Sequence, residues 1–442
     1  QFHPSPRTVD ANRRVHCAAA STPTEMTIFF ARGSPEDVIT PRDAKEALDV
    51  AFEKLGKREK VCIVPPDYTR FHSRAGMLTQ LAYRHYGEAV KDVMPALGSH
   101  EPLTEDEREA MFEIVPAELF RVHDWRNDVV TIGHVPAEVV KEASCGHLDV
   151  PWPAQVNRLV WEGGHDLVLS IGQVVPHEVM GMSNYNKNLF VGLGGKDAID
   201  LSHFIGACYG MERMMGRVDN PLRRILNRAA DDFLQKLPLV YILTVIGPAG
   251  SGGGLALRGL FIGDDEECFK AAAKLSLEVN FTLVPRPIQK AVVFLDRDEF
   301  KSTWLGNKSI YRTRMAMADG GELIVMAPGV TKFGEDPDID VLIRRVRVGE
   351  VRHTLAIHPR VGSVAPRVQR ATRPLPCQWS WRAVGARLKM AALPLTSAEE
   401  LRDTIHARKC QGRWKGRGVG SLCHQEGEGQ SGPDGRRLQI ST

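Results

Sequence analysis

The stretch 166-DLVLSIGQVVPHE-178 contains the clearest indication of the fold. Its first half, Asp166–Ile171, is a largely continuous apolar run rather than an alternation of apolar and polar residues. A strand that is covered on both faces has this pattern, and such strands are typical of parallel sheets. The sequence therefore predicts a buried strand whose carboxyl end leads into a polar turn that carries His177.

Similar runs recur along the chain and alternate with helical patterns. The other predicted strands are Val61–Val64, Val129–Ile132, Leu239–Ile246, Ala291–Leu295 and Glu322–Met326. The predicted helices are Pro41–Leu55, Ala75–Val90, Thr104–Ile114, Trp152–Glu162, Glu266–Leu277 and Ser309–Ala318. Alternating strands and helices are typical of α/β layers. We therefore expect two α/β domains with mainly parallel sheets and an active-site cleft between them.

The length of 442 residues suits two or three domains, at roughly 150 residues each. We expect a disordered N-terminus over 1–24, an N-terminal α/β domain over 25–265 that carries the site, and a C-terminal α/β domain over 266–345. The glycine-rich run Gly247–Gly254 follows a predicted strand. Such a run suits either a phosphate-binding turn or a flexible connection, and the connection is the commoner case.

The net charge of +3 is the sum of two unlike parts. Residues 343–442 contain 19 Lys and Arg against 7 Asp and Glu, a net of +12, and the remainder has 38 against 47, a net of −9. We expect a basic tail of low order over 346–442, where Arg, Gly, Ser and Pro are common. One hypothesis is a basic extension that binds an acidic partner. The other, which the abrupt change favours, is that the tail is not the ancestral reading frame and leaves the second domain incomplete.

Composition narrows the class of protein. The near-neutral total gives no indication of nucleic-acid binding, and no apolar run approaches the ~20 residues that cross a bilayer. None of the 8 Cys forms a CxxC pair, which disfavours a zinc ribbon and suits a reducing compartment. The first residues lack the apolar segment of a secretory signal. These patterns lead us to expect a cytoplasmic protein with no membrane or nucleic-acid partner, and they leave its oligomeric state open.

Polar residues follow the predicted strands where ligands bind in open α/β sheets. Asp67 and Arg70 come directly after Val61–Val64, and His100 lies in a loop before a helix that Thr104 and Glu107 can cap. An Arg can hold a carboxylate or phosphate by two parallel hydrogen bonds, and a neutral His can act as a general base. The alternative without a functional role is a surface ion pair between Asp67 and Arg70 and a solvent-exposed His100 in its loop.

Further along lie His177, then Lys187 within Asn184–Asn188, and then His203. A Lys among amides and glycines suits a phosphate clamp or a covalent anchor. His203 is a possible metal ligand, but no other candidate His lies within five residues of it, unlike the close pairs of most zinc sites. Residue chemistry alone thus indicates a strand-end site that handles an anion.

In this order, the clusters resemble the lactate racemase family, which uses a nickel-pincer nucleotide. The resemblance runs from about Val61 to Asp340 and is carried by the spacing of His177, Lys187 and His203, by Asp67 and Arg70, and by Leu-Gly-Ser-His at His100. It implies that Lys187 is joined covalently to the cofactor, that Asp67 and Lys308 contact the cofactor, and that His203 coordinates nickel. It further implies paired acid/base roles for His100 and His177, and substrate contacts from Arg70 and Lys308.

The implied activity is racemisation or epimerisation of a 2-hydroxy acid by hydride transfer from Cα, through a 2-keto acid. The implied partners are the small substrate and the enzymes that synthesise the cofactor. Trp304-Leu305 replaces the Tyr-Gln of a lactate racemase, and the segment after Lys187 departs from the usual Pro-Gly run, so the substrate stays open. The alternatives are a zinc-dependent hydrolase or lyase that uses the three His residues, and a non-catalytic anion-binding protein.

Overall fold

The computed structural model describes residues 28–250, 253–297, 299–334, 337–338 and 340–341, together with the strands 387–391 and 438–441. The predicted disordered N-terminus at 1–24 and most of the predicted basic tail lie outside the described residues. Both therefore stay predictions, as do the proposed domain limits.

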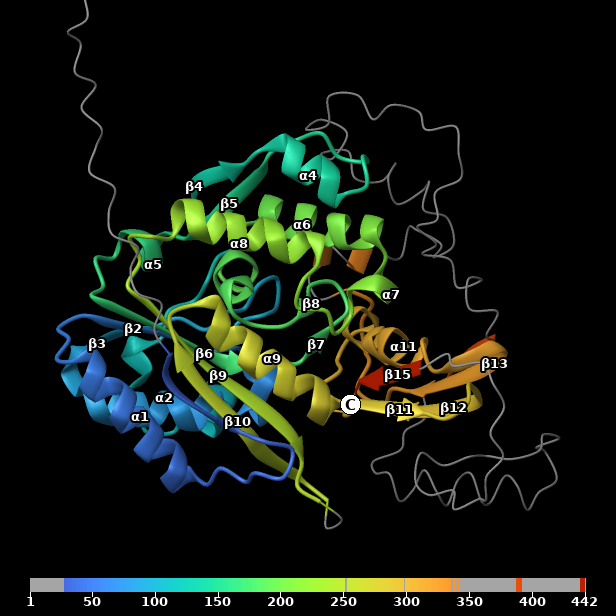
Figure 1. The fold of residues 1–442 in the computed structure, drawn as a ribbon, viewed down its shortest axis with the longest axis horizontal. Helices are drawn as coiled ribbons and strands as arrows, with labels where there is room; N and C mark the ends of the chain where they lie inside the picture. Colours follow the sequence, from blue (N-terminus) through green and yellow to red (C-terminus); the bar gives the residue numbers. More distant parts are fainter. Residues whose placement is uncertain are drawn as a thin grey trace, which may run out of the picture.

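A six-stranded sheet forms the centre of the fold (Figure 1). Its order is β1 (Ile28–Gly33), β10 (Leu255–Gly263), β9 (Leu239–Pro248), β6 (Leu167–Gln173), β2 (Val61–Val64) and β3 (Val90–Val93). The strands β9, β6, β2 and β3 are mutually parallel, and β10 is antiparallel to both of its neighbours. The predicted α/β class with a mainly parallel central sheet is thus confirmed.

Apolar layers cover both faces of this sheet. Leu167, Leu169 and Ile171 of β6 face one layer with the helices α1 (Pro41–Leu55), α2 (Ala75–Tyr86) and α3 (Glu105–Phe112). Val168 faces the other layer, to which α9 (Glu266–Asn280) contributes. Burial on both faces explains why the run in β6 does not alternate. Capping boxes at Thr40 and Thr104 fix the starts of α1 and α3, as the spacing of Thr104 and Glu107 predicts.

A further layer stands over the second face. It contains the hairpin of β4 (Val129–Val135) and β5 (Trp152–Asn157), and the helices α4 (Ala137–Ala143), α5 (Arg158–Glu162), α6 (Lys196–Tyr209), α7 (Met211–Met214) and α8 (Pro221–Phe233). In Figure 1, α6 and α8 lie between the hairpin and the central sheet. Short strands β7 (Pro176–His177) and β8 (Gly181–Met182) pair beneath them. This layer positions one side of the site.

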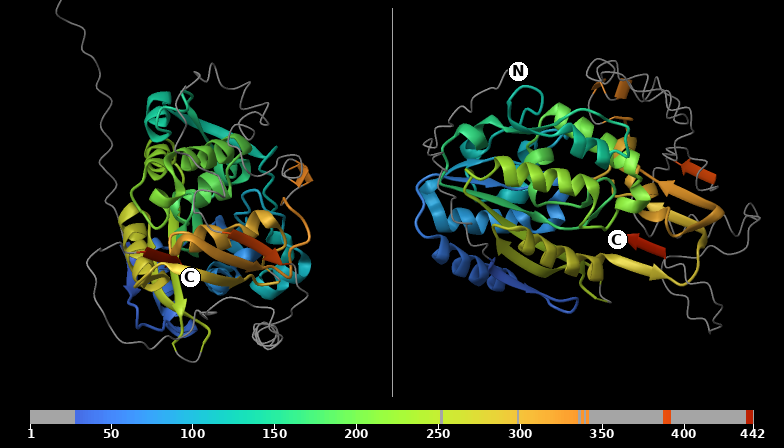
Figure 2. Two further views of the ribbon diagram at one scale, coloured as in Figure 1. Left: turned by 90° about the vertical axis from the view of Figure 1, so that its right-hand side faces the viewer. Right: turned by 45° about the horizontal axis from the view of Figure 1, so that its top comes forward.

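A smaller parallel sheet follows α9. It contains β12 (Ile288–Phe294), β13 (Met317–Met326) and β14 (Arg387–Ala391), while β11 (Phe281–Val284) pairs with β15 (Leu438–Ser441). Two short helices, α10 (Thr303–Gly306) and α11 (Lys308–Thr313), connect β12 to β13. Figures 1 and 2 show β11, β12, β13 and α11 at one end of the molecule. Helix α9, which the predicted limit at 265/266 assigns to the second domain, packs on the central sheet.

Three predicted helices need correction. The predicted helix Ala75–Val90 ends at Tyr86, because a short turn follows and Val90 begins β3. Trp152–Glu162 is not one helix: Trp152, Ala154 and Val156 are buried at every second position of β5, and α5 begins only after Asn157 caps it. Pro151 and Pro153 disfavour a helix there. The predicted helix Ser309–Ala318 ends at Thr313, because Met317 pairs with β12.

The strand that follows the glycine-rich run was not predicted from the sequence. This strand, β10, pairs antiparallel to β9 from Pro248 and Leu255 onward. The run Gly247–Gly254 therefore lies in a hairpin connection, which agrees with the connecting role rather than the phosphate-binding one. Residues 251–252 lie outside the described part.

Candidate active site

The predicted site residues of the first part of the chain meet at one edge of the central sheet. Asp67 follows β2, His100 follows β3 and His177 follows β6, and these strands are parallel neighbours. The amide of Ala96 donates to the carbonyl of Pro65 at 2.8 Å and extends the β2–β3 pairing toward the site. The amide of Gly98 donates to the carbonyl of Gly192 at 2.8 Å, which ties the His100 loop to the segment after Lys187.

Asp67 and His100 form a hydrogen-bonded pair. The Nδ1 atom of His100 lies 2.5 Å from Oδ2 of Asp67, and the hydroxyl of Thr69 donates to Oδ1 at 2.5 Å. Burial alone would raise the pKa of Asp67, but the charge and hydrogen bond of His100, helped by Arg70 and Thr69, lower it to about 2. The carboxylate is therefore ionised at neutral pH. Its observed contact is with His100, whereas the contact with a cofactor that the resemblance implies stays a prediction.

His177 lies in β7, and its ring is held by the turn that follows. Its Nδ1 atom accepts hydrogen bonds from the amides of Val179 (3.1 Å) and Met180 (3.2 Å). Burial lowers the pKa of His177 well below its usual value; Glu178 opposes this effect, and Lys187 adds to it. His177 is therefore a neutral imidazole at pH 7.

The segment that carries Lys187 has an unusual backbone. Asn184 and Tyr185 adopt positive φ values of 61° and 60°, in the left-handed region that non-glycine residues rarely occupy. A π-helix, Asn188–Gly192, follows Lys187 directly. Such π-helical turns frequently occur at functional sites. Strained conformations persist only where the surroundings enforce them.

Arg223 of α8 supplies that enforcement. Its guanidinium donates to the carbonyl of Met182 (2.6 Å), to Oδ1 of Asn186 (2.6 Å) and to the carbonyl of Asn184 (3.3 Å). The side chain is 1% exposed and lies over the ring of Phe269 at 4.7 Å. The sequence reading missed Arg223, whose only signal is a charged residue on the apolar face of an amphipathic helix.

Lys187 is surrounded by other cations. Burial lowers its pKa to about 7, and Arg70, Lys308 and Arg223 add to the shift, whereas Glu178 opposes it. A large share of the amine is therefore neutral at physiological pH. A neutral amine is a nucleophile, which an ordinary surface Lys is not.

His203 lies on α6, one turn after Ile199. Its Nδ1 atom donates to the carbonyl of Ile199 at 2.8 Å, and among the described residues its Nε2 atom has no hydrogen-bond partner. Burial lowers the pKa of His203, so Nε2 carries a free lone pair. A metal-ligating His typically donates its other ring N–H to a carbonyl or carboxylate in this way.

Lys308 reaches the site from α11. Burial and Arg70 lower its pKa to about 8, and Glu178 opposes them. Two residues to which the sequence reading gave no role join this group. Glu178 is buried beside His177, and Arg312, one turn after Lys308, has a buried Nε atom that lacks a hydrogen-bond partner among the described residues. The i, i+4 spacing from Lys308 was the signal for Arg312.

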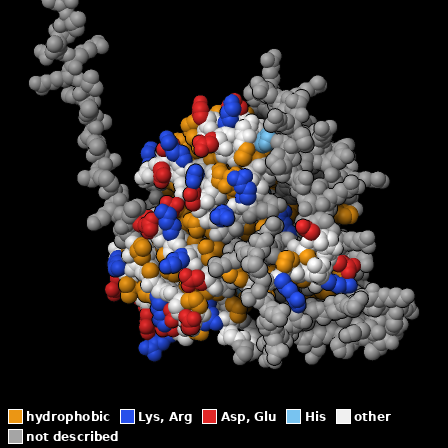
Figure 3. Space-filling view, turned by 45° about the vertical axis from the view of Figure 1, so that its right-hand side comes forward, with side chains coloured by type: hydrophobic (Ala, Val, Ile, Leu, Met, Phe, Trp, Pro, Cys, Tyr) orange, Lys and Arg blue, Asp and Glu red, His pale blue; other side chains and the backbone are white. Residues whose placement is uncertain are grey.

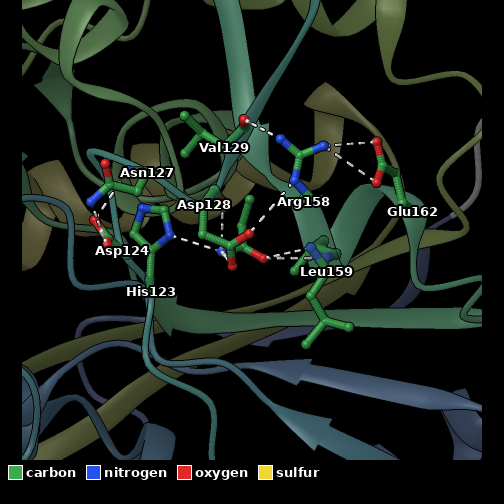
Figure 4. Close-up of polar contacts among 10 residues, drawn as sticks. His123, Asp124, Asn127, Asp128, Val129, Arg158, Leu159 and Glu162 are labelled. Atoms are coloured by element: carbon green, nitrogen blue, oxygen red, sulfur yellow. Dashed lines mark hydrogen bonds and ion pairs between the residues drawn. The ribbon is translucent and has the colours of Figure 1, made fainter.

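A second polar network fixes the approach to α6 (Figure 4). The side-chain amide of Asn157 donates to Nδ1 of His123 at 3.0 Å, and Nε2 of His123 donates to the carbonyl of Gly194 at 3.1 Å. The Asn157 oxygen also caps α5 through the amide of Leu159. Burial lowers the pKa of His123, so the neutral ring completes the network. It links α5 to the glycine turn from which α6, and hence His203, begins.

The described residues contain no group of three or more His, Cys, Asp or Glu that could hold a metal ion. They also contain no helix long and apolar enough to cross a bilayer. On the described part of the face in Figure 3, basic and acidic side chains are interspersed rather than gathered by sign.

The chain is similar to known proteins over most of its described length. Residues 43–214 match the family profile described as the lactate racemase N-terminal domain. A crystal structure of a Thermotoga maritima protein from the Northeast Structural Genomics Consortium covers 80% of this chain and 88% of its own, with a TM-score of 0.67 and 28% identity. The lactate racemase apoprotein from Thermoanaerobacterium thermosaccharolyticum covers 81% and 82%, with a TM-score of 0.52 and 18% identity, and shares the fold. No curated protein matches the chain.

The matched domain contains six of the predicted site residues: Asp67, Arg70, His100, His177, Lys187 and His203. Lys308 lies beyond it. The resemblance read from these residues is confirmed over this segment: residues 43–214 match the lactate racemase N-terminal domain.

Proposed function

We propose that this protein is a racemase or epimerase of a 2-hydroxy acid that uses a nickel-pincer nucleotide attached to Lys187. One observation carries the proposal: Lys187, Lys308 and His203 all lie close enough to His177 for their charges to lower its pKa. A reactive amine, a single free imidazole nitrogen and a carboxylate-binding cation thus occur together. The match of residues 43–214 to the lactate racemase N-terminal domain supports a racemase role in general.

The residues present fit the proposed cofactor. The pKa of Lys187, about 7, makes its amine available for an amide-like bond to a carboxyl-derived group. His203 offers one nitrogen, with its other ring N–H already engaged by Ile199. A protein that supplies one metal ligand needs a metal whose other donors belong to the cofactor, and a pincer nucleotide provides those donors.

The remaining side chains suit a 2-hydroxy acid. Arg70 and Lys308 would hold the carboxylate, because a guanidinium and an ammonium both bind that group. When bound, the cofactor would supply the acceptor for the Cα hydrogen, which is a poor acid beside a carboxylate and leaves more easily as a hydride. His100 and His177 would exchange the hydroxyl proton, a contribution of about 10²–10⁴-fold in rate for each such group.

The alternative of a zinc-dependent hydrolase or lyase has less support. It needs His100, His177 and His203 around one ion, yet no group of three or more His, Cys, Asp or Glu that could hold a metal ion occurs among the described residues. A non-catalytic anion-binding protein explains the cations but gives no role to the nucleophilic amine of Lys187. Both alternatives remain outcomes of the experiment below.

The test is to produce the chain together with the enzymes that synthesise the cofactor. We expect nickel and a mass increase confined to the peptide that contains Lys187. Lys187→Ala should lose both the adduct and the activity, whereas Lys274→Ala, at an exposed position of α9, should keep both. Stoichiometric zinc on a chain with unmodified Lys187 would contradict the proposal.

The substrate is then found with a panel of single enantiomers of 2-hydroxy acids, from short aliphatic acids to sugar acids. Chiral chromatography should detect the opposite configuration for at least one of them. A chain that carries nickel and the adduct but converts none of the panel would place the substrate outside this class.

A further inference from the structure

We infer that His100 and His177 are held in opposite tautomers, and that Asp67 is a positioning residue that keeps His100 ready to accept a proton. This inference rests on the proposed function for its chemical meaning, but not for its geometry. It makes the two His residues unequal partners rather than mirror images.

The tautomer of His100 follows from its partner. Asp67 is ionised, with a pKa of about 2, so its Oδ2 atom can only accept a hydrogen bond. The Nδ1 atom of His100, 2.5 Å away, must therefore carry the proton. In the neutral ring the lone pair is then on Nε2, for which no hydrogen bond is found among the described residues. The His100 side chain is 23% exposed.

The opposite holds for His177. Two backbone amides, those of Val179 and Met180, donate to its Nδ1 atom, so that atom must be unprotonated. In the neutral ring the proton is then on Nε2. Moving it to Nδ1 would leave two amides without an acceptor, at a cost of about 1–3 kcal/mol for each buried group. His177 therefore presents an N–H to the site.

Different roles follow for the two rings at the start of a turnover. A substrate whose hydroxyl faces His100 can pass its proton to Nε2, and the cofactor, when bound, would accept the hydride of Cα as the alcohol becomes a ketone. A substrate whose hydroxyl faces His177 instead receives a hydrogen bond from Nε2–H. That enantiomer is bound more tightly in its ground state and is less ready to react.

This asymmetry has a kinetic signature. Two enantiomers have the same free energy, so kcat/KM must be equal in the two directions. We therefore expect kcat and KM to differ between the enantiomers by the same factor. The enantiomer whose hydroxyl faces His177 should have the lower kcat and the lower KM. Equal kcat values in both directions would contradict the inference.

Nuclear magnetic resonance of the chain without cofactor tests the tautomers directly. Ring nitrogens of ¹⁵N-labelled His, assigned with His100→Gln and His177→Gln, should show Nδ1–H at His100 and Nε2–H at His177. In Asp67→Asn the side-chain amide can donate to Nδ1, so His100 should switch to Nε2–H. Finding Nε2–H at His100 in the unaltered chain, or no change in Asp67→Asn, would overturn the assignment.

A matched pair elsewhere provides the control. Nε2 of His165 lies 2.8 Å from Oδ2 of Asp92, and this buried pair sits at the amino end of β6, away from the site. Asp92→Asn should change the resonances of His165 and leave those of His100 unchanged. A change in the His100 resonances of this variant would show that they respond to a general loss of structural stability rather than to the hydrogen-bond partner of His100.

Kinetics of the cofactor-loaded enzyme complete the test. Asp67→Asn should lower kcat by about 10²–10⁴-fold, the usual contribution of a positioned general base, while nickel and the Lys187 adduct are retained. Asp67→Glu should recover part of the loss, which a purely structural role would not predict. If the tautomers are as stated but no cofactor is ever attached, the proposed function fails and the positioning role of Asp67 stands.

Discussion

Replacing Arg223 with Met should destabilise the chain more than any surface change and should disturb Lys187 in particular. The change removes three hydrogen bonds from a buried guanidinium, to Met182, Asn184 and Asn186, and keeps apolar contact with Phe269. Each buried acceptor left without a donor costs about 1–3 kcal/mol. Partial relaxation and the removal of a buried charge offset some of this cost. We therefore expect a loss of about 3–5 kcal/mol in the free energy of unfolding.

Thermal unfolding measures this loss. At roughly 2–4 °C per kcal/mol for a domain of this size, the midpoint should fall by about 6–20 °C. The control is Arg224→Met, one position along α8, where the side chain is exposed and pairs with Asp219. An exposed pair contributes about 0.2–1 kcal/mol, so this variant should stay close to the unaltered chain. Equal shifts in the two variants would refute the argument.

A second measurement separates local from global effects. Arg223 is one of the charges that lower the pKa of Lys187, and it holds the backbone that positions this residue. At a temperature where Arg223→Met is still folded, the amine of Lys187 should therefore react more slowly with an acylating reagent at pH 7.5. Unchanged reactivity would show that Arg223 stabilises α8 but does not shape the site.

Three further results are expected. The free energy of unfolding should fall as the pH decreases below about 6.5. The pKa values of His123, His177 and His203 are lowered in the folded state, so the unfolded chain binds more protons at these residues. Urea unfolding at a series of pH values measures this loss. Peptide mapping after brief acylation at pH 7.5 should find Lys187 modified before the exposed Lys274, because the pKa of Lys187 is lowered to about 7; an equal rate would contradict that shift. Arg312→Gln should weaken binding of a small dicarboxylate to the cofactor-free chain in calorimetry, whereas the exposed Arg228→Gln should not.

The sequence predicted the site better than it predicted the elements around it. Strand-end positions of Asp67, His100 and His177 follow from local patterns, because parallel neighbouring strands bring their carboxyl ends together whatever else the chain does. The hairpin strand β10 was missed, since the glycines before it mask its start and only its pairing with β9 identifies it. Trp152–Glu162 was misread because an apolar segment of that length suits either a helix or a strand followed by a helix.

The supporting residues were beyond local patterns. Arg223 contacts residues about 40 positions earlier in the chain. Glu178 precedes α9 in the sequence and Lys308 follows it, yet the two side chains interact in the folded chain. No spacing rule links such positions, because tertiary packing alone brings them together. The tautomers of His100 and His177 belong to the same class of property, since hydrogen-bond partners determine them and residue identity does not.

The charge of the site runs against the charge of the chain. Residues 1–342 have a net charge of −9, yet four basic side chains meet at the site: Arg70, Lys187, Lys308 and Arg312. The carboxylates whose charges act on this group include Asp67, Glu178 and Glu299. Exposed charges are largely screened beyond about 8 Å at physiological salt, so the acidic surface has little effect on an anion that has reached the site. Partly buried cations at short range are screened less. Acylation of Lys187 would leave Arg70, Lys308 and Arg312, so three basic side chains would still be present to bind an anionic substrate after attachment of the proposed cofactor.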